Sequence, residues 1–104
     1  MAQFDVYANP NPETKRTIPY LLDVQTDLLS NLTTRVVIPL YSVSAMGKAA
    51  KHLNPKFSIN KTTVILSTAE LAGVTLNRLG ENVCSLKEHR NEIIAALDFL
   101  ITGI

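Results

Sequence analysis

The residues with catalytic or metal-binding chemistry are few and far apart in this 104-residue chain. His52 and His89 are the only imidazoles, and neither belongs to a His-x-x-x-His pair or a carboxylate cluster of the kind that binds metal ions. Cys84 is the only thiol; it precedes a predicted helix, whose N-terminus would lower the thiol pKa, and His89 follows five residues later. A cysteine–histidine nucleophile is one interpretation, but a small buried residue that closes a strand is the simpler one.

Other signatures of catalysis are equally weak. The four glycines are too scattered for a phosphate-binding loop, and no Gly-x-Ser-x-Gly motif occurs. Asp23 and Asp27 are the only close carboxylate pair with apolar neighbours, but their spacing at a strand end is little evidence for acid–base chemistry. We therefore expect a protein that is not an enzyme and that carries no metal or other cofactor.

Length and composition predict a single domain over residues 1–104. With 46% hydrophobic residues, a chain of this size buries one core but not two domains with a cleft between them. One cysteine allows no intramolecular disulfide, which favours a reducing cytoplasm. The first twenty residues contain charges and three prolines, and no apolar run is long enough for a bilayer. We expect a cytoplasmic protein that contacts no membrane.

Charge is distributed unevenly, although 10 basic and 9 acidic residues nearly balance. No acid lies between Asp27 and Glu70, whereas that stretch holds five cations: Arg35, Lys48, Lys51, Lys56 and Lys61. Acids outnumber cations on both flanks. Such a segment suits phosphate or an acidic partner, although scattered surface lysines are the default interpretation.

The pattern of apolar residues predicts short strands followed by one helix. Alternating or β-branched segments predict strands over Gln3–Tyr7, Ile18–Val24 and Thr34–Tyr41, a hairpin formed by Phe57–Asn60 and Thr63–Ser67, and short pieces near Val74, Leu76 and Val83. Pro39 should lie at a bulge, bend or edge because it cannot donate a hydrogen bond. Asn9–Thr17 and Gln25–Thr33 are predicted loops, the second unusual for its leucines, and Ser42–Lys51 allows one or two helical turns.

The C-terminal helix is the most strongly indicated element. Ser85 and Glu88 have capping-box spacing, and the helix should run from Leu86 to about Ile101, before Gly103 ends it. Seven apolar residues form a wide arc on one side: Leu86, Ile93, Ile94, Ala96, Leu97, Leu100 and Ile101. Since this arc is wide for one small sheet, either a partner covers part of it or it forms the rim of the same core.

Four strings, in this order, resemble the CcdB family over essentially the whole chain. They are Gln3-Phe4-x-Val6-Tyr7, Asp23-Val24-Gln25-x-Asp27, Arg35-x-Val37-Ile38-Pro39-Leu40 and the terminal Gly103-Ile104. Members of this family are toxins of plasmid and chromosomal toxin–antitoxin modules that poison DNA gyrase. The resemblance implies an SH3-like barrel, mainly β with a C-terminal α-helix, in which a bent antiparallel sheet is joined by a small three-stranded sheet and the helix packs across the main sheet.

The family resemblance also implies a mode of action. Members are homodimers that insert their paired C-terminal ends between the arms of the gyrase A subunit dimer and trap the DNA-cleaved state. An acidic, partly disordered antitoxin wraps the toxin and displaces it from gyrase, and the resulting complex represses the operon. The basic middle segment of this chain would contribute to meeting that acidic antitoxin.

Residue by residue, the resemblance implies gyrase contacts in two places, at the C-terminal end and just after the second string. The family's binding end corresponds to Asp98, Phe99, Ile101, Thr102, Gly103 and Ile104, and the apolar pair after the second string corresponds to Leu28 and Leu29. The wide helical arc predicts Leu97, Leu100 and Ile101 near the dimer seam. Thr102 stands where the best-known family pattern has Trp, and Arg90 where it has Glu.

Two other functions compete with gyrase poisoning. Related SH3-like barrels among toxins are ribonucleases, and Asp23, Arg35 and His89 are the available acid–base and phosphate-binding candidates, without convincing spacing. A module that binds DNA directly through the Lys48–Lys61 region ranks third, because no recognition helix is predicted.

Overall fold

The computed structural model describes residues 2–50 and 52–103. Met1, Lys51 and Ile104 lie outside the described residues. Within the described ranges, the strands and α-helices are β1 (Asp5–Ala8), β2 (Tyr20–Asp23), β3 (Thr34–Ser42), α1 (Val43–Met46), β4 (Lys56–Ile59), β5 (Thr62–Leu66), β6 (Ala72–Thr75), β7 (Asn82–Ser85) and α2 (Arg90–Thr102). Short 3-10 turns, η1 to η4, lie at Asp27–Leu29, Thr68–Glu70, Leu76–Arg78 and Lys87–His89.

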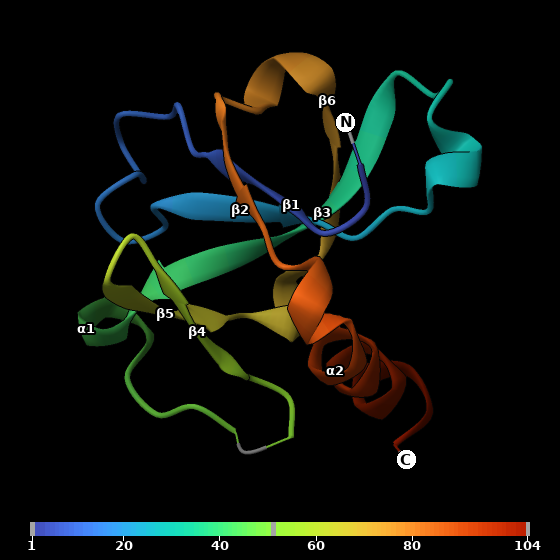
Figure 1. Cartoon of the computed structure of the whole chain (residues 1–104). Coiled ribbons are helices and arrows are strands. Elements are labelled where there is room, and N and C mark those ends of the chain that lie inside the picture. The colour runs from blue at the N-terminus through green and yellow to red at the C-terminus, as the bar shows by residue number, and fades with distance from the viewer. Residues whose placement is uncertain (1, 51, 104) are drawn as a thin grey trace.

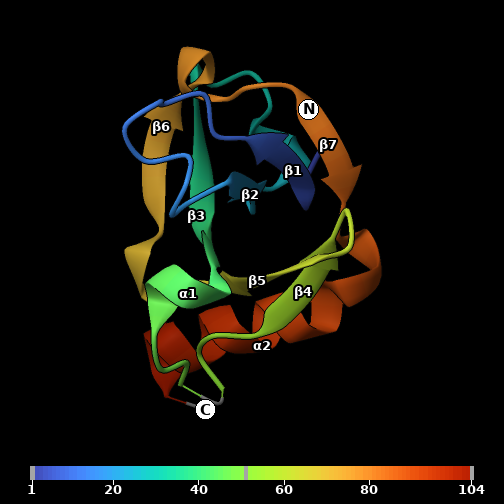
Figure 2. The ribbon, with the colours of Figure 1, turned by 90° about the vertical axis from the view of Figure 1, so that its left-hand side faces the viewer.

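The strands form one curled antiparallel sheet in the order β4-β5-β3-β2-β1-β7. The strand β6 pairs with the first half of β3, on the edge opposite β2. The long strand β3 belongs to two parts, because its start pairs with β6 and its end with β5. Figures 1 and 2 show the five strands β7, β1, β2, β3 and β6 bending away from the smaller β3-β5-β4 part. The predicted mainly β fold with a C-terminal helix is confirmed.

Pro39 lies at the point where β3 changes its partner. It falls between the last β6 pair, Val37 with Ala72, and the first β5 pair, Leu40 with Leu66. Its carbonyl accepts from the Ser67 amide at 3.0 Å, just beyond β5. In a strand, the N–H and C=O of one residue point to the same side. The missing proline N–H would therefore face the gap between β6 and β5, and no ladder hydrogen bond is lost. Of the predicted bulge, bend or edge, Pro39 therefore occupies an edge position between two partner strands.

Opposite faces of the sheet have different roles. Val6, Leu22 and Ile38 are cross-strand neighbours on β1, β2 and β3, and all three are completely buried. The core they begin is completed by Phe4, just before β1, and by residues of β3, β4, β5 and α2, among them Leu40, Phe57, Ile59, Val64, Leu66 and Ile93. Because side chains alternate along a strand, Tyr7, Leu21, Asp23 and Arg35 point to the other face.

Most predicted elements are present, with shifted ends. The β4–β5 hairpin turns at Asn60 and Lys61, whose φ angles of 50° and 66° suit a two-residue turn with both central residues left-handed. α1 forms a short helix within Ser42–Lys51, where one or two helical turns were expected. Leu76 lies in the η3 turn, so the strand expected there was wrong, whereas Val74 and Val83 lie in β6 and β7.

α2 begins later than the sequence predicts. The Ser85 hydroxyl accepts from the Lys87 amide at 3.2 Å rather than from Glu88, and the 3-10 turn η4 occupies the expected first turn of the helix. The helix then runs from Arg90 to Thr102. Gly103 ends it as predicted: its φ of 77° is left-handed, and its amide donates to the Phe99 carbonyl at 3.0 Å.

Only part of the predicted apolar arc of α2 is covered. Ile93 and Ala96 are buried, and Ile94, Leu97 and Leu100 are half-buried. Ile101 is 73% exposed, so this chain by itself does not cover that end of the arc, and its cover by a partner stays a prediction. The helix lies beneath β4 and β5 in Figure 2, beside the small part of the sheet rather than across the main part. Among the described residues, neither helix is long and apolar enough to cross a membrane.

Candidate partner-binding surfaces

The string Asp23 to Asp27 is anchored by a buried ion pair. The Arg35 guanidinium donates through Nε to Asp23 Oδ2 at 2.8 Å, and its Nη2 lies 2.8 Å from the same oxygen. Both side chains are almost completely buried. Burial raises the pKa of Asp23 above its ordinary value, and the hydrogen bonds from Arg35 and from the Gln25 amide oppose that rise. The pair therefore joins the end of β2 to the start of β3.

Gln25 extends this connection to the following loop. Its Oε1 accepts from the Val36 amide at 3.1 Å, and its Nε2 donates to the Leu29 carbonyl at 3.0 Å. The Arg35 Nη2 also donates to the Gln25 carbonyl, at 3.3 Å. One buried amide side chain thus fixes β3 on one side and the η1 turn on the other.

Asp27 attaches the same loop to the N-terminal segment. Its Oδ1 accepts from the Gln3 amide at 2.8 Å, while the Gln3 side chain donates to the Val24 carbonyl at 3.1 Å. The Thr26 hydroxyl caps the η1 turn by accepting from the Leu28 amide. Asp23 and Asp27 therefore have separate structural partners and do not form an acid–base pair.

The loop held in this way presents leucines to solvent. Leu28 is 91% exposed, and Leu29 and Leu32 are each about half exposed. We call residues 26–33 the leucine loop; it is the cyan segment at the right of Figure 1. A large apolar side chain that projects from a hydrogen-bonded loop is a typical anchor for a protein partner.

The end of α2 forms a second exposed surface. Asp98, Phe99, Ile101 and Thr102 are exposed, and the Thr102 hydroxyl donates to the Asp98 carbonyl at 2.7 Å. The Phe99 ring lies 5.8 Å from the His52 ring, so the loop before β4 covers one side of it. The sequence-based assignment of Ile104 falls outside the described residues. In Figure 1 the leucine loop and the end of α2 are well separated within one chain.

The structure does not bring the three ribonuclease candidates together as a catalytic group. Asp23 and Arg35 are buried and bind each other, so neither faces a substrate. His89 lies in η4, where its ring is 5.1 Å from that of Phe57 and its Nδ1 is 3.2 Å from Glu92. Within the part of the chain that the structure describes, His89 forms no hydrogen bond or ion pair with Asp23 or Arg35.

Cys84 is half-buried in β7, which agrees with the simpler interpretation of a small buried residue that closes a strand. Burial, with a smaller contribution from Asp5, raises the pKa of the thiol. The predicted lowering by a helix N-terminus was wrong because η4 separates Cys84 from α2. A raised pKa leaves little thiolate at neutral pH, which argues against the cysteine–histidine nucleophile.

A polar group on the same face as Arg35 centres on Tyr7. Its hydroxyl donates to Asp5 Oδ2 at 3.4 Å, and the Asn82 side chain donates to the same oxygen at 3.0 Å. Burial, then the charges of Asp5 and Asp23, raises the pKa of Tyr7 to about 12. The phenol is therefore held neutral and serves as a structural donor.

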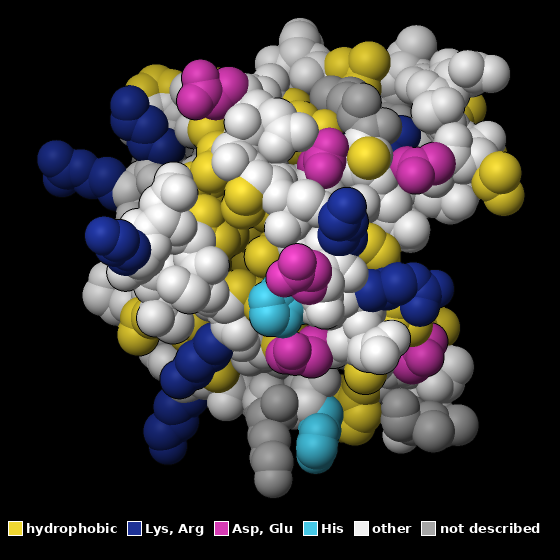
Figure 3. All heavy atoms as spheres, in the orientation of Figure 1, with side chains coloured by type: hydrophobic (Ala, Val, Ile, Leu, Met, Phe, Trp, Pro, Cys, Tyr) yellow, Lys and Arg dark blue, Asp and Glu magenta, His cyan; other side chains and the backbone are white. Residues whose placement is uncertain are grey.

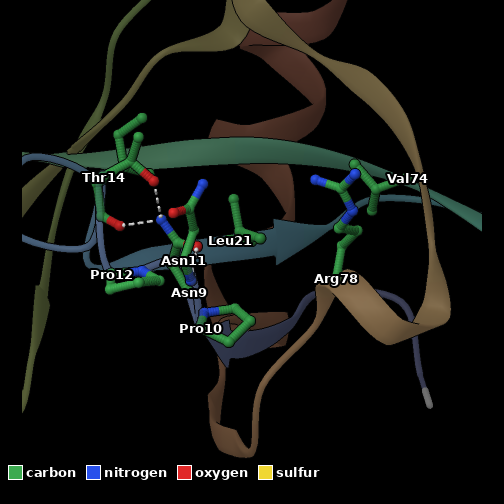
Figure 4. A pocket seen from close by; sticks show the side chains of 9 residues that line it. Asn9, Pro10, Asn11, Pro12, Thr14, Leu21, Val74 and Arg78 are labelled. Carbon is green, nitrogen blue, oxygen red and sulfur yellow. Dashed lines mark hydrogen bonds between the residues drawn. The ribbon is translucent and has the colours of Figure 1, made fainter.

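A hollow of about 420 Å³ opens on this face beside Leu21. Figure 4 shows Arg78 and Val74 on one wall and the prolines and asparagines of residues 9–12 on the other. The Asn9 side chain fixes that second wall by donating to Thr14 Oγ1 and to the Ile18 carbonyl. Arg78 is the charged side chain that lines the hollow. In the described ranges, no group of three or more His, Cys, Asp or Glu residues is placed to bind a metal ion.

Sequence reasoning missed the structural role of Gln25 and Arg35. A lone arginine inside an apolar strand, together with an aspartate at the end of the preceding strand, was the available signal of a buried pair. Gln25 gave no comparable signal, because its partners are backbone groups of Leu29 and Val36 that only the folded chain brings near.

Comparison with known proteins supports both the fold and a family. A family model described as CcdB protein matches residues 3–103. Among solved structures, the chain is similar to an endoribonuclease in complex with its cognate antitoxin from a mycobacterial species, with 12% identity, a TM-score of 0.76 and coverage of 97% of this chain and 94% of that one. A second mycobacterial endoribonuclease matches with 12% identity, a TM-score of 0.72 and coverage of 97% and 90%. At this identity the structural matches show a shared fold alone.

Proposed function

This chain belongs to the CcdB family of toxin–antitoxin toxins, and we propose that it acts by binding the gyrase A subunit and trapping the gyrase–DNA cleavage complex. The observation that carries the proposal is the contrast between the family strings and the residues beside them. Asp23, Gln25 and Arg35 are buried and fully engaged, whereas Leu28 next to them is 91% exposed. The buried residues of the family strings thus hold in place Leu28, an apolar side chain that does not contribute to the core.

The end of α2 supports the proposal in the same way. Ile101 is 73% exposed and Phe99 is 39% exposed, so both are available to a partner. Asp98, Thr102, Gly103 and Ile104 complete this proposed gyrase-binding end, and Leu29 joins Leu28 in the leucine loop. Thr102 replaces a large aromatic anchor, which shifts the apolar contribution toward Ile101 and Phe99.

We assign three partners besides gyrase. A second copy of the chain would place Leu97, Leu100 and Ile101 near the seam about a two-fold axis and bring the two helix ends together. A cognate antitoxin, acidic and partly disordered, would neutralise the toxin. Operator DNA would be bound only by the toxin–antitoxin complex, which represses its own operon.

The decisive assay measures supercoiling and DNA cleavage by purified gyrase with and without the protein. We expect loss of supercoiling and accumulation of linear, gyrase-linked DNA. The same preparation, incubated with RNA, tests the alternative, a ribonuclease toxin on a related barrel. RNA degradation without any effect on gyrase would contradict the proposal.

The ribonuclease alternative is kept as the second candidate because both structural neighbours are described as endoribonucleases, but at 12% identity they share only the fold with this chain. Against it, Asp23 and Arg35 are buried in a mutual ion pair, and His89 is engaged with Phe57 and Glu92. A ribonuclease of this fold would therefore have to use residues other than those three. Gyrase poisoning remains the function that we propose.

A further inference from the structure

One side of the molecule is strongly basic. We use the name basic face for Lys15, Arg16, Lys48, Lys56 and Lys61, which are all exposed. They come from the loop between β1 and β2, the segment after α1, and the β4–β5 hairpin. In Figure 3 the Lys and Arg side chains extend along the left edge over these elements, whereas most Asp and Glu side chains lie toward the centre and right. Segments distant in sequence therefore contribute to one charged surface.

No ion pair between described residues neutralises the charge of the basic face. Between described residues, the ion pairs are Arg35 with Asp23 and His89 with Glu92, and neither involves the basic face. Glu13 is the one acid in the sequence segments 9–17 and 43–63, which carry this face. Five exposed cations from segments that contain one acid create a positive potential that attracts a polyanion.

The composition of the basic face fits a phosphate backbone better than a peptide. A peptide partner is usually held by apolar anchors in a pocket, with charges at the rim. Of the large apolar side chains that are exposed, Val43 in α1 is the one that comes from the segments of this face, while the leucine loop and the end of α2 provide five others. The approximately 420 Å³ hollow has Arg78 rather than these lysines in its wall. Charge without apolar anchors is typical of sequence-independent DNA contacts.

Its position makes the basic face compatible with the other proposed surfaces. In Figure 1, α1 and the β4–β5 hairpin lie at the left, opposite the leucine loop at the right. The segment after α1 reaches the end of α2, where the His52 ring lies 5.8 Å from the Phe99 ring. Gyrase residues bound at the leucine loop would leave the basic face free. We propose that the basic face contacts the phosphate backbone of the duplex DNA that the toxin–antitoxin complex occupies. This inference rests on the proposed co-repression, and it assigns part of the DNA contact in that complex to the toxin.

A charge-neutralised variant tests the proposal. Lys48→Gln and Lys56→Gln remove two charges, and Lys61→Asn removes a third with a residue that tolerates the left-handed φ of 66° at that position. The matched control is Lys87→Gln with Arg90→Gln, which neutralises exposed cations in η4 and at the start of α2. Equal thermal midpoints for both variants and the native protein establish that the fold is intact.

The measurement is the salt dependence of DNA binding, followed by fluorescence anisotropy. Two labelled probes are used: a short random-sequence duplex with the toxin alone, and the operator duplex with the toxin–antitoxin complex. Each phosphate contact contributes about 0.9 to the slope of log affinity against log salt concentration. We expect the triple variant to lower that slope by about one to three units on the operator duplex and the control to leave it unchanged. Weaker binding of the random duplex should accompany this change.

Further readouts separate the possible explanations. An unchanged operator slope in the triple variant would overturn the proposal, as would an equal decrease in the control. If the triple variant loses affinity for the antitoxin in the absence of DNA, the basic face binds the acidic antitoxin and the DNA contact is wrong. Gyrase cleavage should be the same for native and triple-variant toxin. If neither cleaves, the proposed function fails while the DNA measurement still stands on its own.

Discussion

The Arg35 guanidinium binds the Asp23 carboxylate at 2.8 Å in a site that excludes water from both side chains. This pair connects β2 to β3 and, through Gln25, to the leucine loop. The residues that identify the family in the sequence are thus structural, and the exposed leucine that they support is the surface proposed to meet gyrase.

Removal of one member of this pair should destabilise the protein severely. Arg35→Ala leaves the Asp23 carboxylate buried without its cation, which typically costs about 3 to 5 kcal/mol. Denaturant unfolding measures the effect. The double variant Asp23→Leu with Arg35→Met should recover much of the loss, because apolar residues of similar volume need no partner. If Arg35→Ala leaves the midpoint unchanged, the buried pair does not stabilise this fold.

Leu28 and Leu22 should separate binding from folding. Leu28→Ala removes a side chain that is 91% exposed, so the unfolding free energy should change by less than about 0.5 kcal/mol while gyrase cleavage decreases. Leu22→Ala is the matched control, because Leu22 is completely buried and its truncation should cost about 2 to 5 kcal/mol. Chemical denaturation and the cleavage assay are measured on both variants. Full cleavage activity in folded Leu28→Ala would remove the leucine loop from the proposed site.

The extent to which sequence predicted structure differs from element to element. The hairpin at Asn60 and Lys61 was predicted because both strands and the turn are local. The start of α2 was misplaced because Ser85 accepts from Lys87 and a 3-10 turn replaces the first α-helical turn, a choice that the capping pattern does not encode. Ile101 was placed on an apolar arc by periodicity, but periodicity does not tell how many residues of an arc one chain covers.

The same limit applied to the candidate chemistry. The alternative of a lowered thiol pKa for Cys84 rested on its distance to a helix in sequence, whereas burial in β7 raises that pKa. The spacing of Asp23 and Asp27 gave little evidence for acid–base chemistry, and the fold gives each carboxylate a different partner. Sequence spacing identifies residues of a motif, and only the fold decides whether their side chains meet.

Ile93 and Ile101 test the phase of α2. Ile93→Ala should create a cavity costing about 2 to 5 kcal/mol because Ile93 is completely buried. Ile101→Ala should leave the unfolding free energy of the isolated chain nearly unchanged, since its side chain is 73% exposed. Denaturation at low protein concentration supplies both values, and light scattering at higher concentration should show a weaker dimer for Ile101→Ala. Equal destabilisation by the two substitutions would contradict the observed helix orientation.

Tyr7 predicts a loss of stability in alkaline solution. Its pKa is about 12 in the folded protein and 10.0 ordinarily, so the folded state retains the proton more strongly than the unfolded state. The resulting stability is fully present below pH 10 and is lost as pH rises toward 12, by about 2 to 3 kcal/mol in total. Tyr7→Phe has no ionisable phenol and should show a flatter decline over this range. Parallel stability curves for the two proteins would mean that the phenol titrates normally.

Thr102 offers a gain-of-binding test of the proposed gyrase-binding end. The side chain is exposed in the last turn of α2, so Thr102→Trp should fold normally and place a large apolar ring beside Ile101. If gyrase binds this end, the ring should increase affinity about tenfold, which corresponds to roughly 1.4 kcal/mol.

The matched control is Asn91→Trp, which adds the same ring at an exposed position of the first turn of α2. Calorimetric titration of both variants with the gyrase A fragment measures the effect. Equal affinities for Thr102→Trp, Asn91→Trp and the native protein would show that gyrase does not contact this turn, whereas a gain confined to Thr102→Trp supports the assignment.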